Sequence, residues 1–382
     1  MIDDTMIYNE LGDSGIRVAA LGFGTMRWAN EEQCHRIMNR GLDRGMNYVD
    51  TSTGYLDGQS QVWVADAIRD RRDEILFSSK SFWASAKSAD TVRRRIEETL
   101  ETLELDYFDL YQLWGLQSVA MLNKATKKGG FLEGVRKAQD DGLIKLGVGF
   151  TFHGTPESFR AAVDTGEFLC ATVSYNLAKR KEADQIRYAA EHGVGVIIMN
   201  PLGGGPLARH DDRKLDFLRR RGTGPSYGAL RFLLADGDIS TSLIGCATLD
   251  ELEENLRAIE NPEQLTEAFR RTLVERMEDA AFTSEDICTG CGYCRDCPND
   301  FDPSEFMELM RDFSLYVSDD EDLVDWLRAR YAEAGKPLEA ELAKCEECGL
   351  CEDKCPQHLP IVESIQGIKD ELSRSRQAAE GV

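Results

Sequence analysis

The sequence has no apolar run long enough to cross a membrane. A transmembrane helix needs about 20 consecutive apolar residues, and no stretch of this 382-residue chain approaches that length. The first residues, Met1 to Asp4, also lack the basic and apolar stretches of a secretory signal. We therefore expect a cytoplasmic protein with no membrane partner.

Basic side chains are scarce. The chain has 45 lysines and arginines against 68 aspartates and glutamates, which gives a formal net charge of -23 at pH 7. Nucleic acids and anionic membranes attract basic surfaces. The charge therefore argues against a nucleic-acid partner.

Cysteine is plentiful only near the C-terminus. Eight of the 11 cysteines form two runs, Cys288-x2-Cys291-x2-Cys294-x2-Cys297-Pro298 and Cys345-x2-Cys348-x2-Cys351-x3-Cys355-Pro356. Three thiolates at this spacing curl a loop around one iron-sulfur cube, and in two-cluster ferredoxins the fourth ligand comes from the other run. The spacing therefore predicts two [4Fe-4S] clusters. The predicted ligand sets are Cys288, Cys291, Cys294 and Cys355 for one cluster, and Cys345, Cys348, Cys351 and Cys297 for the other.

Structural zinc and disulfides are the alternatives for these cysteines. Zinc sites with four cysteines usually use two separated C-x2-C pairs, and disulfide scaffolds are usually short and secreted. The first run has two residues before its Cys-Pro, where three are usual. Because Cys297 is predicted to bind the other cluster, the geometry of its own loop does not fix this spacing. Residues 282–382 carry 24 acidic and 10 basic side chains, which indicates either solubility alone or a docking face for a basic redox partner.

The first two thirds of the chain repeat a strand-helix pattern. From residue 19 to about 260, apolar β-branched segments alternate with stretches of helical period eight times. Eight units in this length predict a closed (β/α)8 TIM barrel, with residues 6–11 and 17–18 as a hairpin over its bottom. A doubly wound open sheet is the alternative, but the turn after the first strand lacks G-x-G-x-x-G spacing. The expected strands are 20–24, 47–51, 75–80, 108–114, 144–150, 171–175, 194–200 and 242–246.

The rest of the chain is expected to be helical. We predict that the barrel occupies residues 1–261 and that a helical connector occupies 262–281. A small, mainly α-helical ferredoxin-like domain with both clusters is predicted over 282–372, followed by a polar tail over 373–382. Its helices between the two cysteine runs are expected at 304–313, 320–331 and 338–344.

Three side chains follow the carboxyl ends of neighbouring expected strands, where barrel enzymes carry their catalytic residues. Asp50 ends the second strand, Tyr55 lies in the following loop, and Lys80 ends the third strand. A lysine cation beside a tyrosine stabilises the phenolate and lowers its pKa from about 10. We expect Asp50 to hold Lys80 charged, and Tyr55 to act as general acid or base on a carbonyl oxygen. The ordinary explanation of a lone Asp or Lys is a surface ion pair.

The segments around these residues, 47–55, 77–80 and 106–113, resemble the aldo-keto reductases, and the resemblance covers roughly residues 6–260. With the cysteine-rich extension, the chain resembles aldo-keto reductase-like proteins with a C-terminal two-cluster ferredoxin domain. One residue departs from the family, because Trp114 stands where a histidine usually orients the carbonyl. Its indole offers one N–H donor and does not titrate. Loss of a well-placed donor at such a site typically costs about 10²–10³ in rate.

Other residues near this position give two further hypotheses. Trp114, Trp83 and Trp28 form an aromatic wall for a planar or apolar substrate, or they are ordinary rim and core aromatics. His153, after the fifth strand, is a candidate replacement for the missing imidazole.

The resemblance also implies a nicotinamide coenzyme site. The Thr151 hydroxyl is expected to bind the carboxamide of the coenzyme. The loops after the seventh and eighth strands are expected to bind its phosphates. Thr248-x-x-Glu251 is also a candidate capping box. The expected coenzyme-binding set is Gly24, Thr25, Met26, Thr151, Leu202, Gly203, Gly204, Thr248, Glu251, Glu254 and Asn255. Within this set, Glu254 and Asn255 resemble the pair that contacts the adenine in the family.

Some positions of this site depart from the family. Phe152, Thr172 and Met199 replace the usual asparagine, glutamine and stacking tyrosine. Acidic Asp250 and Glu251 stand where a 2′-phosphate prefers Arg or Lys, which favours NADH.

The leading interpretation is an oxidoreductase in which the barrel reduces or oxidises a carbonyl, enone or aromatic substrate with NAD(P)H, coupled to electron transfer through two clusters. Hydride carries two electrons and each cluster carries one, so that direct exchange normally needs a flavin. No flavin motif is evident. Either a flavin-containing partner supplies this step, or the clusters drive chemistry at the substrate that is not hydride transfer, or the clusters are mainly structural. Two alternatives stay open: a ferredoxin- or flavoprotein-driven reductase that does not use nicotinamide, and a non-catalytic electron-relay subunit.

Overall fold

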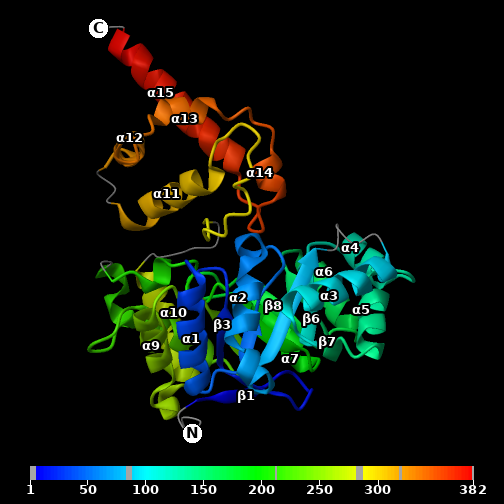
Figure 1. Cartoon of the computed structure of the whole chain (residues 1–382). Coiled ribbons are helices and arrows are strands. Elements are labelled where there is room, and N and C mark those ends of the chain that lie inside the picture. The colour runs from blue at the N-terminus through cyan, green and yellow to red at the C-terminus, as the bar shows by residue number, and fades with distance from the viewer. Residues whose placement is uncertain (1–5, 83–87, 211–212, 281–286, 318–320, 381–382) are drawn as a thin grey trace. The chain divides into compact units, whose positions relative to one another are not determined.

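All eight expected strands form, and they close into one parallel barrel (Figure 1). Around the barrel they follow in the order β10-β3-β4-β5-β6-β7-β8-β9, so that each strand pairs with its sequence neighbour and β10 closes on β3. The TIM barrel is therefore confirmed, and the open sheet is excluded. The strands are β3 (Leu21–Gly24), β4 (Tyr48–Asp50), β5 (Leu76–Phe82), β6 (Phe108–Leu116), β7 (Ile144–Phe152), β8 (Cys170–Ser174), β9 (Gly195–Met199) and β10 (Thr241–Ile244).

The computed structural model describes residues 6–82, 88–210, 213–280, 287–317 and 321–380. The chain divides into two compact units, Met1–Thr283 and Ser284–Val382. In the first unit, helices connect successive strands and cover the outside of the barrel (Figure 1). These helices are α1 (Glu31–Asp43), α2 (Gln59–Ala67), α3 (Ala89–Leu103), α4 (Val119–Thr126), α5 (Phe131–Asp140), α6 (Pro156–Asp164), α7 (Ala183–Glu191), α8 (Ser226–Leu234) and α9 (Leu249–Leu256).

The predicted hairpin also forms and closes one end of the barrel. Strands β1 (Tyr8–Glu10) and β2 (Arg17–Ala19) pair antiparallel. Leu11, just after β1, is fully buried in a cluster that includes Leu110 and Ile197 from inside the barrel. The hairpin therefore closes the amino-terminal end of the barrel. The carboxyl ends of the strands, where barrel enzymes carry their sites, lie at the opposite end.

Helix α10 (Glu267–Asp279), within the predicted connector, packs on the barrel unit. Its Arg270 donates hydrogen bonds to Asp236 Oδ2 at 2.6 Å and to the Tyr175 hydroxyl at 2.9 Å. The ends of the predicted domains at residues 261, 281 and 372 stay predictions.

The C-terminal unit is a small helical domain whose core includes cysteines of both runs. Its helices are α11 (Pro303–Tyr316), α12 (Leu323–Glu333), α13 (Leu338–Ala343), α14 (Leu350–Asp353) and α15 (Ile361–Glu380). Phe306, Leu327 and Ile365 are fully buried in one cluster with Cys288, Cys294 and Cys355. Helix α15 continues through most of the segment predicted to be a polar tail. Because the core is small and contains ligand cysteines, we expect this unit to depend on its clusters for stability.

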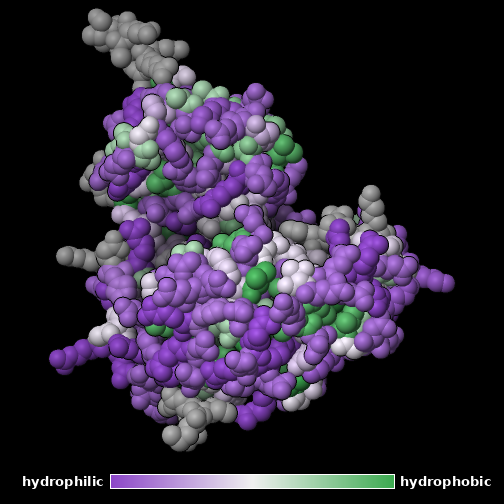
Figure 2. All heavy atoms as spheres, viewed as in Figure 1, coloured by the Kyte–Doolittle hydropathy of each residue, from purple (hydrophilic) through white to green (hydrophobic). Residues whose placement is uncertain are grey.

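Hydrophilic side chains cover most of the visible surface, with small apolar areas between them (Figure 2). Within the described part of the chain, none of the helices combines the length and apolarity that a bilayer-spanning segment needs.

Candidate functional site

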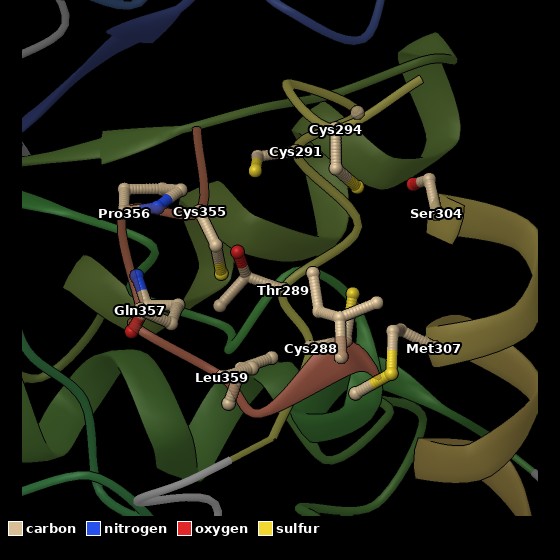
Figure 3. A pocket seen from close by; sticks show the side chains of 12 residues that line it. Cys288, Thr289, Cys291, Cys294, Ser304, Met307, Cys355, Pro356, Gln357 and Leu359 are labelled. Carbon is tan, nitrogen blue, oxygen red and sulfur yellow. The ribbon is translucent and has the colours of Figure 1, made fainter. Parts of the chain in front are cut away.

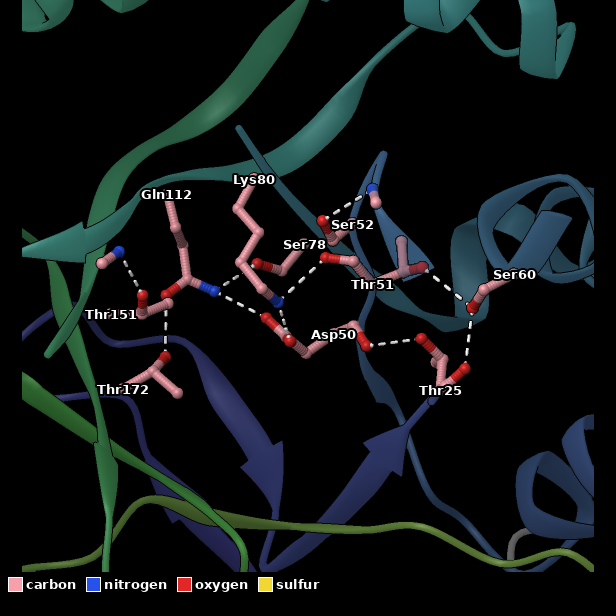
Figure 4. Close-up of polar contacts among 12 residues, drawn as sticks. Thr25, Asp50, Thr51, Ser52, Ser60, Ser78, Lys80, Gln112, Thr151 and Thr172 are labelled. Carbon is pink, nitrogen blue, oxygen red and sulfur yellow. Dashed lines mark hydrogen bonds and ion pairs between the residues drawn. The ribbon is translucent and has the colours of Figure 1, made fainter. Parts of the chain in front are cut away.

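A buried ion pair lies at the carboxyl ends of β4 and β5. Lys80 pairs with Asp50 Oδ1, and its Nζ donates to the Thr51 carbonyl oxygen at 3.0 Å (Figure 4). The side chains of Lys80 and Asp50 are only 2% and 5% exposed. Burial raises the pKa of Asp50, and the Lys80 ammonium offsets part of this rise. The structure thus brings together two residues of the predicted catalytic set, and the Asp50 carboxylate fixes the position of the Lys80 ammonium.

Tyr55 lies beside this pair. The Lys80 Nζ is 4.7 Å from the centroid of the Tyr55 ring. Tyr55 begins a short 3-10 turn in which Leu56 and Asp57 have positive φ angles of 51° and 54°. Left-handed backbone costs a non-glycine residue roughly 1–2 kcal/mol, and such strain is concentrated at functional sites. The loop therefore holds Tyr55 against the lysine at a cost in local stability.

Trp114 occupies the position opposite Tyr55. The two ring centroids are 5.7 Å apart with an interplanar angle of 86°, and the Lys80 Nζ lies 5.9 Å from the indole. Gly54 permits this approach, because a Cβ there would lie 3.1 Å from the indole Cη2. All four residues of the predicted catalytic set are thus close together.

The other aromatic and imidazole candidates are less well placed. Trp28 is buried, and Trp83 lies outside the described residues. His153 directly follows β7, is half-buried, and donates its backbone N–H to Leu116 O at 3.0 Å. Its role as a substitute for the usual histidine stays a prediction.

Sequence reasoning missed Gln112, which connects the ion pair to the next strands. Its Nε2 donates to Asp50 Oδ2 at 2.7 Å and to Ser78 Oγ at 2.9 Å. Its Oε1 accepts from Thr172 Oγ1 at 2.7 Å (Figure 4). These contacts fix the amide orientation and hold the second carboxylate oxygen. The sequence does contain an indication of this role. Gln112 is a polar residue two positions before Trp114, and residues two apart in a strand point to the same side.

Replacing Lys80 by methionine is expected to lower the free energy of unfolding by about 3–5 kcal/mol near pH 7, because Asp50 would keep a buried, uncompensated charge. Burial already raises the pKa of Asp50, and loss of the ammonium raises it further. A raised folded-state pKa means that stability is lost as pH rises and regained on acidification. Urea unfolding between pH 4 and pH 8 should therefore show the deficit shrinking toward pH 4.

The double variant Asp50→Asn/Lys80→Met is the control, because it has no buried charge at this position. Its stability should depend on pH less than that of Lys80→Met. Equal pH dependence in both variants would contradict a buried, charged Asp50.

The nicotinamide end of the expected coenzyme site contains two buried hydroxyls. Thr151 and Thr172 face each other in the register of β7 and β8, and both are 1% exposed. Thr151 Oγ1 accepts from the Gly115 N–H at 2.7 Å, whereas Thr172 donates to Gln112. Nearby, Thr25 donates to the Asp50 carbonyl oxygen at 3.0 Å. Gly24, at the end of β3, and Met26 flank this threonine.

The loop after β9, one of the two loops expected on the phosphates, contacts the loop after β3. Arg27, which follows Met26, donates to the Gly204 carbonyl oxygen at 3.2 Å. Leu202 and Gly203 belong to the same loop after β9, where Gly203 and Gly204 have positive φ angles of 66° and 81°. The loop after β9 therefore has the glycine conformations that a close backbone approach requires.

The expected capping box forms only in part. Thr248 accepts from Glu251 N at 3.2 Å and is the N-cap of α9. The Glu251 carboxylate accepts from Ala247 N at 2.7 Å rather than from the N-cap backbone. The predicted capping box is therefore wrong in this detail, because the Glu251 carboxylate bonds to Ala247 and not to Thr248.

The expected adenine-contacting pair makes internal contacts. Glu254 Oε1 accepts from Gly224 N at 3.0 Å and from Ser226 Oγ at 2.6 Å, and its Oε2 lies 3.0 Å from His210 Nε2. Asn255 is buried and donates to Cys246 Sγ at 3.4 Å. These contacts join the loop before α8 to α9. Adenine binding by Glu254 and Asn255 stays a prediction.

The eight cysteines of the two runs line two separate cavities in the C-terminal unit. One cavity is lined by Cys288, Cys291, Cys294 and Cys355. Figure 3 shows their sulfurs around a common space, with Cys355 arriving on a later segment than the other three. The second cavity is lined by Cys297, Cys345, Cys348 and Cys351. The fold thus brings together the exchanged ligand sets that the spacing predicts.

Within the described ranges, the cysteine sulfurs are not gathered closely enough for a single zinc ion. Four thiolates at about 2.3 Å from a tetrahedral zinc ion lie roughly 3.8 Å from one another. Within the described ranges, no three of the cysteine sulfurs lie within 4.8 Å of one another. An iron-sulfur cube binds each thiolate to a different iron and so separates the sulfurs more widely.

Two family models match the chain. The model of the aldo/keto reductase family matches residues 20–275, and that of a 4Fe-4S dicluster domain matches residues 287–360. The protein therefore belongs to the aldo/keto reductase family. Within that family it is an oxidoreductase that carries a C-terminal ferredoxin-like domain of the 4Fe-4S type.

Curated relatives match the barrel part. The uncharacterized oxidoreductase YqkF of Bacillus subtilis is 22% identical over 297 residues, which cover 68% of this chain and 92% of that protein. L-galactose dehydrogenase of Arabidopsis thaliana is 24% identical over 288 residues, which cover 67% of this chain and 88% of that protein.

Solved structures show the same fold. The holo form of an aldo-keto reductase of Bacillus halodurans has a TM-score of 0.61 at 24% identity and covers 71% of this chain and 96% of its own. An aldo/keto reductase of Klebsiella pneumoniae in complex with NADP and acetate has a TM-score of 0.56 at 22% identity, and it covers 68% of this chain and 94% of its own.

Proposed function

We propose that the barrel catalyses NAD(P)H-dependent reduction or oxidation of a small carbonyl, enone or aromatic substrate, with Tyr55 as general acid or base. The observation that carries this proposal is the buried Asp50–Lys80 pair, whose ammonium lies 4.7 Å from the Tyr55 ring. The ammonium stabilises the phenolate, so that Tyr55 gives a proton to the substrate oxygen in reduction and takes it back in oxidation.

Trp114 gives the site a different character from one with histidine. Its ring lies edge-to-face with Tyr55 and next to Lys80. The indole contributes a flat apolar surface and one N–H donor, and it cannot take up a proton. We therefore propose that the substrate is planar or apolar, and that Tyr55 alone moves the proton.

The two buried threonines support a nicotinamide coenzyme. Thr151 accepts from Gly115 N, which leaves its own proton to donate, and Thr172 donates to Gln112, which leaves a lone pair to accept. A carboxamide presents the complementary acceptor and donor. When bound, the coenzyme would supply hydride, and the threonines would orient its ring.

The cysteine cavities support two [4Fe-4S] clusters that exchange electrons with a redox partner. Bound clusters would supply one-electron transfer, whereas the barrel chemistry needs two electrons. A flavin-containing partner would connect the clusters with the barrel chemistry, because a flavin takes part in both one-electron and two-electron transfer. The eight cysteines that line the two cavities would hold the clusters.

One set of contacts favours a second candidate, a reductase that does not use nicotinamide. Both carboxylate oxygens of Glu254 contact the protein, and Met199 replaces the stacking aromatic ring. Electrons would then come from a ferredoxin or a flavoprotein through the clusters. Coenzyme binding separates the two candidates.

Anaerobic titration with NADH and NADPH is expected to change nicotinamide fluorescence, with NADH bound more tightly because Asp250 and Glu251 disfavour a 2′-phosphate. Replacing Thr151 by valine should raise the dissociation constant about 5- to 10-fold, the worth of one hydrogen bond. Ser118→Ala, at the N-cap of α4, is a control for loss of a hydroxyl. Unchanged fluorescence at millimolar concentrations of both coenzymes would exclude the first candidate in favour of the second.

A further inference from the structure

The two cysteine cavities differ in their exposure to solvent. In the first, Cys288, Cys294 and Cys355 are each 8% exposed and Cys291 is half-buried. In the second, Cys348 is exposed and the other cysteines are half-buried. Electron transfer between proteins is favoured where a redox centre lies near the surface. The inference below rests on the proposed function, because it assumes that both cavities hold clusters.

The two cavities also differ in charge. Residues 288–296 contain one arginine and one aspartate, whereas residues 345–353 contain four acidic side chains and no basic one. Near the first cavity, Arg311 donates to the Cys288 carbonyl oxygen at 3.3 Å. Near the second, Lys369 donates to the Cys345 carbonyl oxygen at 2.9 Å and pairs with Glu347 at 3.3 Å. Glu346 lines this cavity, and both Glu346 and Glu347 are exposed. The segment 345–353, which Lys344 and Lys354 flank, is thus more acidic than the segment 288–296.

An apolar side chain lies among these acidic residues. Leu350 is 46% exposed and lines the second cavity together with Cys348 and Cys351. In the described part of the chain, Leu56 is the other large apolar side chain that is similarly exposed. An exposed apolar residue within a charged rim is the common arrangement of a binding surface.

We propose that Glu346, Glu347, Cys348, Leu350 and Asp353 form a docking face for a one-electron redox protein whose cofactor edge is surrounded by lysines and arginines. Leu350 packs against the apolar cofactor edge, and the carboxylates pair with the basic rim. In each encounter, the cluster held at the second cavity loses one electron and the cofactor of the partner gains it, or the reverse.

Cytochrome c, a basic one-electron haem protein, is a suitable probe. Reduction of cytochrome c by the anaerobically reduced full-length protein would be followed by stopped flow at several salt concentrations. Isothermal titration calorimetry with the oxidised protein gives the dissociation constant independently of electron transfer. Iron content is measured first, because failure to bind two clusters would contradict the proposed function rather than the docking face.

Glu346→Lys is expected to lower the second-order rate constant about 3- to 10-fold at low salt and to weaken its salt dependence. The matched control is Glu333→Lys, which makes the same charge change at the end of α12. Figure 1 shows α12 and α14 on opposite sides of the C-terminal unit, and the control should stay within twofold of the unmodified protein.

Leu350→Ala should raise the dissociation constant for cytochrome c about fivefold. The loss of binding should exceed any change in the rate with hexaamminecobalt(III), because that small cation needs no apolar contact. If Glu333→Lys slows the reaction as much as Glu346→Lys, or if Leu350→Ala leaves cytochrome c binding unchanged, the proposed face is wrong.

Discussion

Replacing Tyr55 by phenylalanine is expected to lower kcat about 10²–10⁴-fold with little change in KM. Phenylalanine keeps the edge-to-face contact with Trp114 but removes the hydroxyl that moves the proton, and general acid-base catalysis typically contributes this factor. No second acid is expected to compensate, because the indole does not titrate. The measurement is steady-state turnover of a carbonyl substrate that the unmodified protein converts.

Tyr8→Phe is the matched control. Its hydroxyl donates to the Gly45 carbonyl oxygen at 2.8 Å, beside the hairpin that closes the other end of the barrel. This variant should keep full turnover with a small loss of stability. Undiminished turnover in Tyr55→Phe would remove Tyr55 from the reaction and make His153 the next residue to test.

The barrel was predictable because its signal is local and repeated. Each strand is a short β-branched segment followed by a helix of regular period, and closure follows from eight such units. Asp50 and Lys80 were found for the same reason, since the strand ends place them at one edge. The predicted (β/α)8 order is therefore confirmed, and the strand ends differ from the prediction by a few residues.

The side-chain contacts of the site were not predictable in this way. Gln112 contacts Asp50 and Thr172 across three strands, and nothing in its own segment indicates which residues it meets. Glu254 accepts from Gly224, in a loop without regular period, and from Ser226 at the start of α8. Such contacts depend on tertiary packing, which local patterns of sequence do not encode.

In the C-terminal unit too, local patterns were predictable and tertiary packing was not. The spacing of the cysteines predicted which four would meet, because a cube imposes its own geometry on the chain. The asymmetry of the two cavities was not predictable, since it depends on tertiary packing, which places Met307, Leu359 and Ile361 around the first cavity. Leu350 resembles any other apolar residue until its exposure is known.

The exchange of ligands between the two runs has a sharp test in paired cysteine variants. Cys355→Ala/Cys288→Ala removes two ligands from one cavity, so that iron should fall from about eight to about four per chain. Cys355→Ala/Cys345→Ala removes one ligand from each cavity and should impair both clusters. If each run instead bound its own cluster, the two double variants would exchange their results. Iron analysis with electron paramagnetic resonance of the reduced proteins therefore distinguishes the two arrangements, because the pair that spares one cluster identifies the cysteines that share the other.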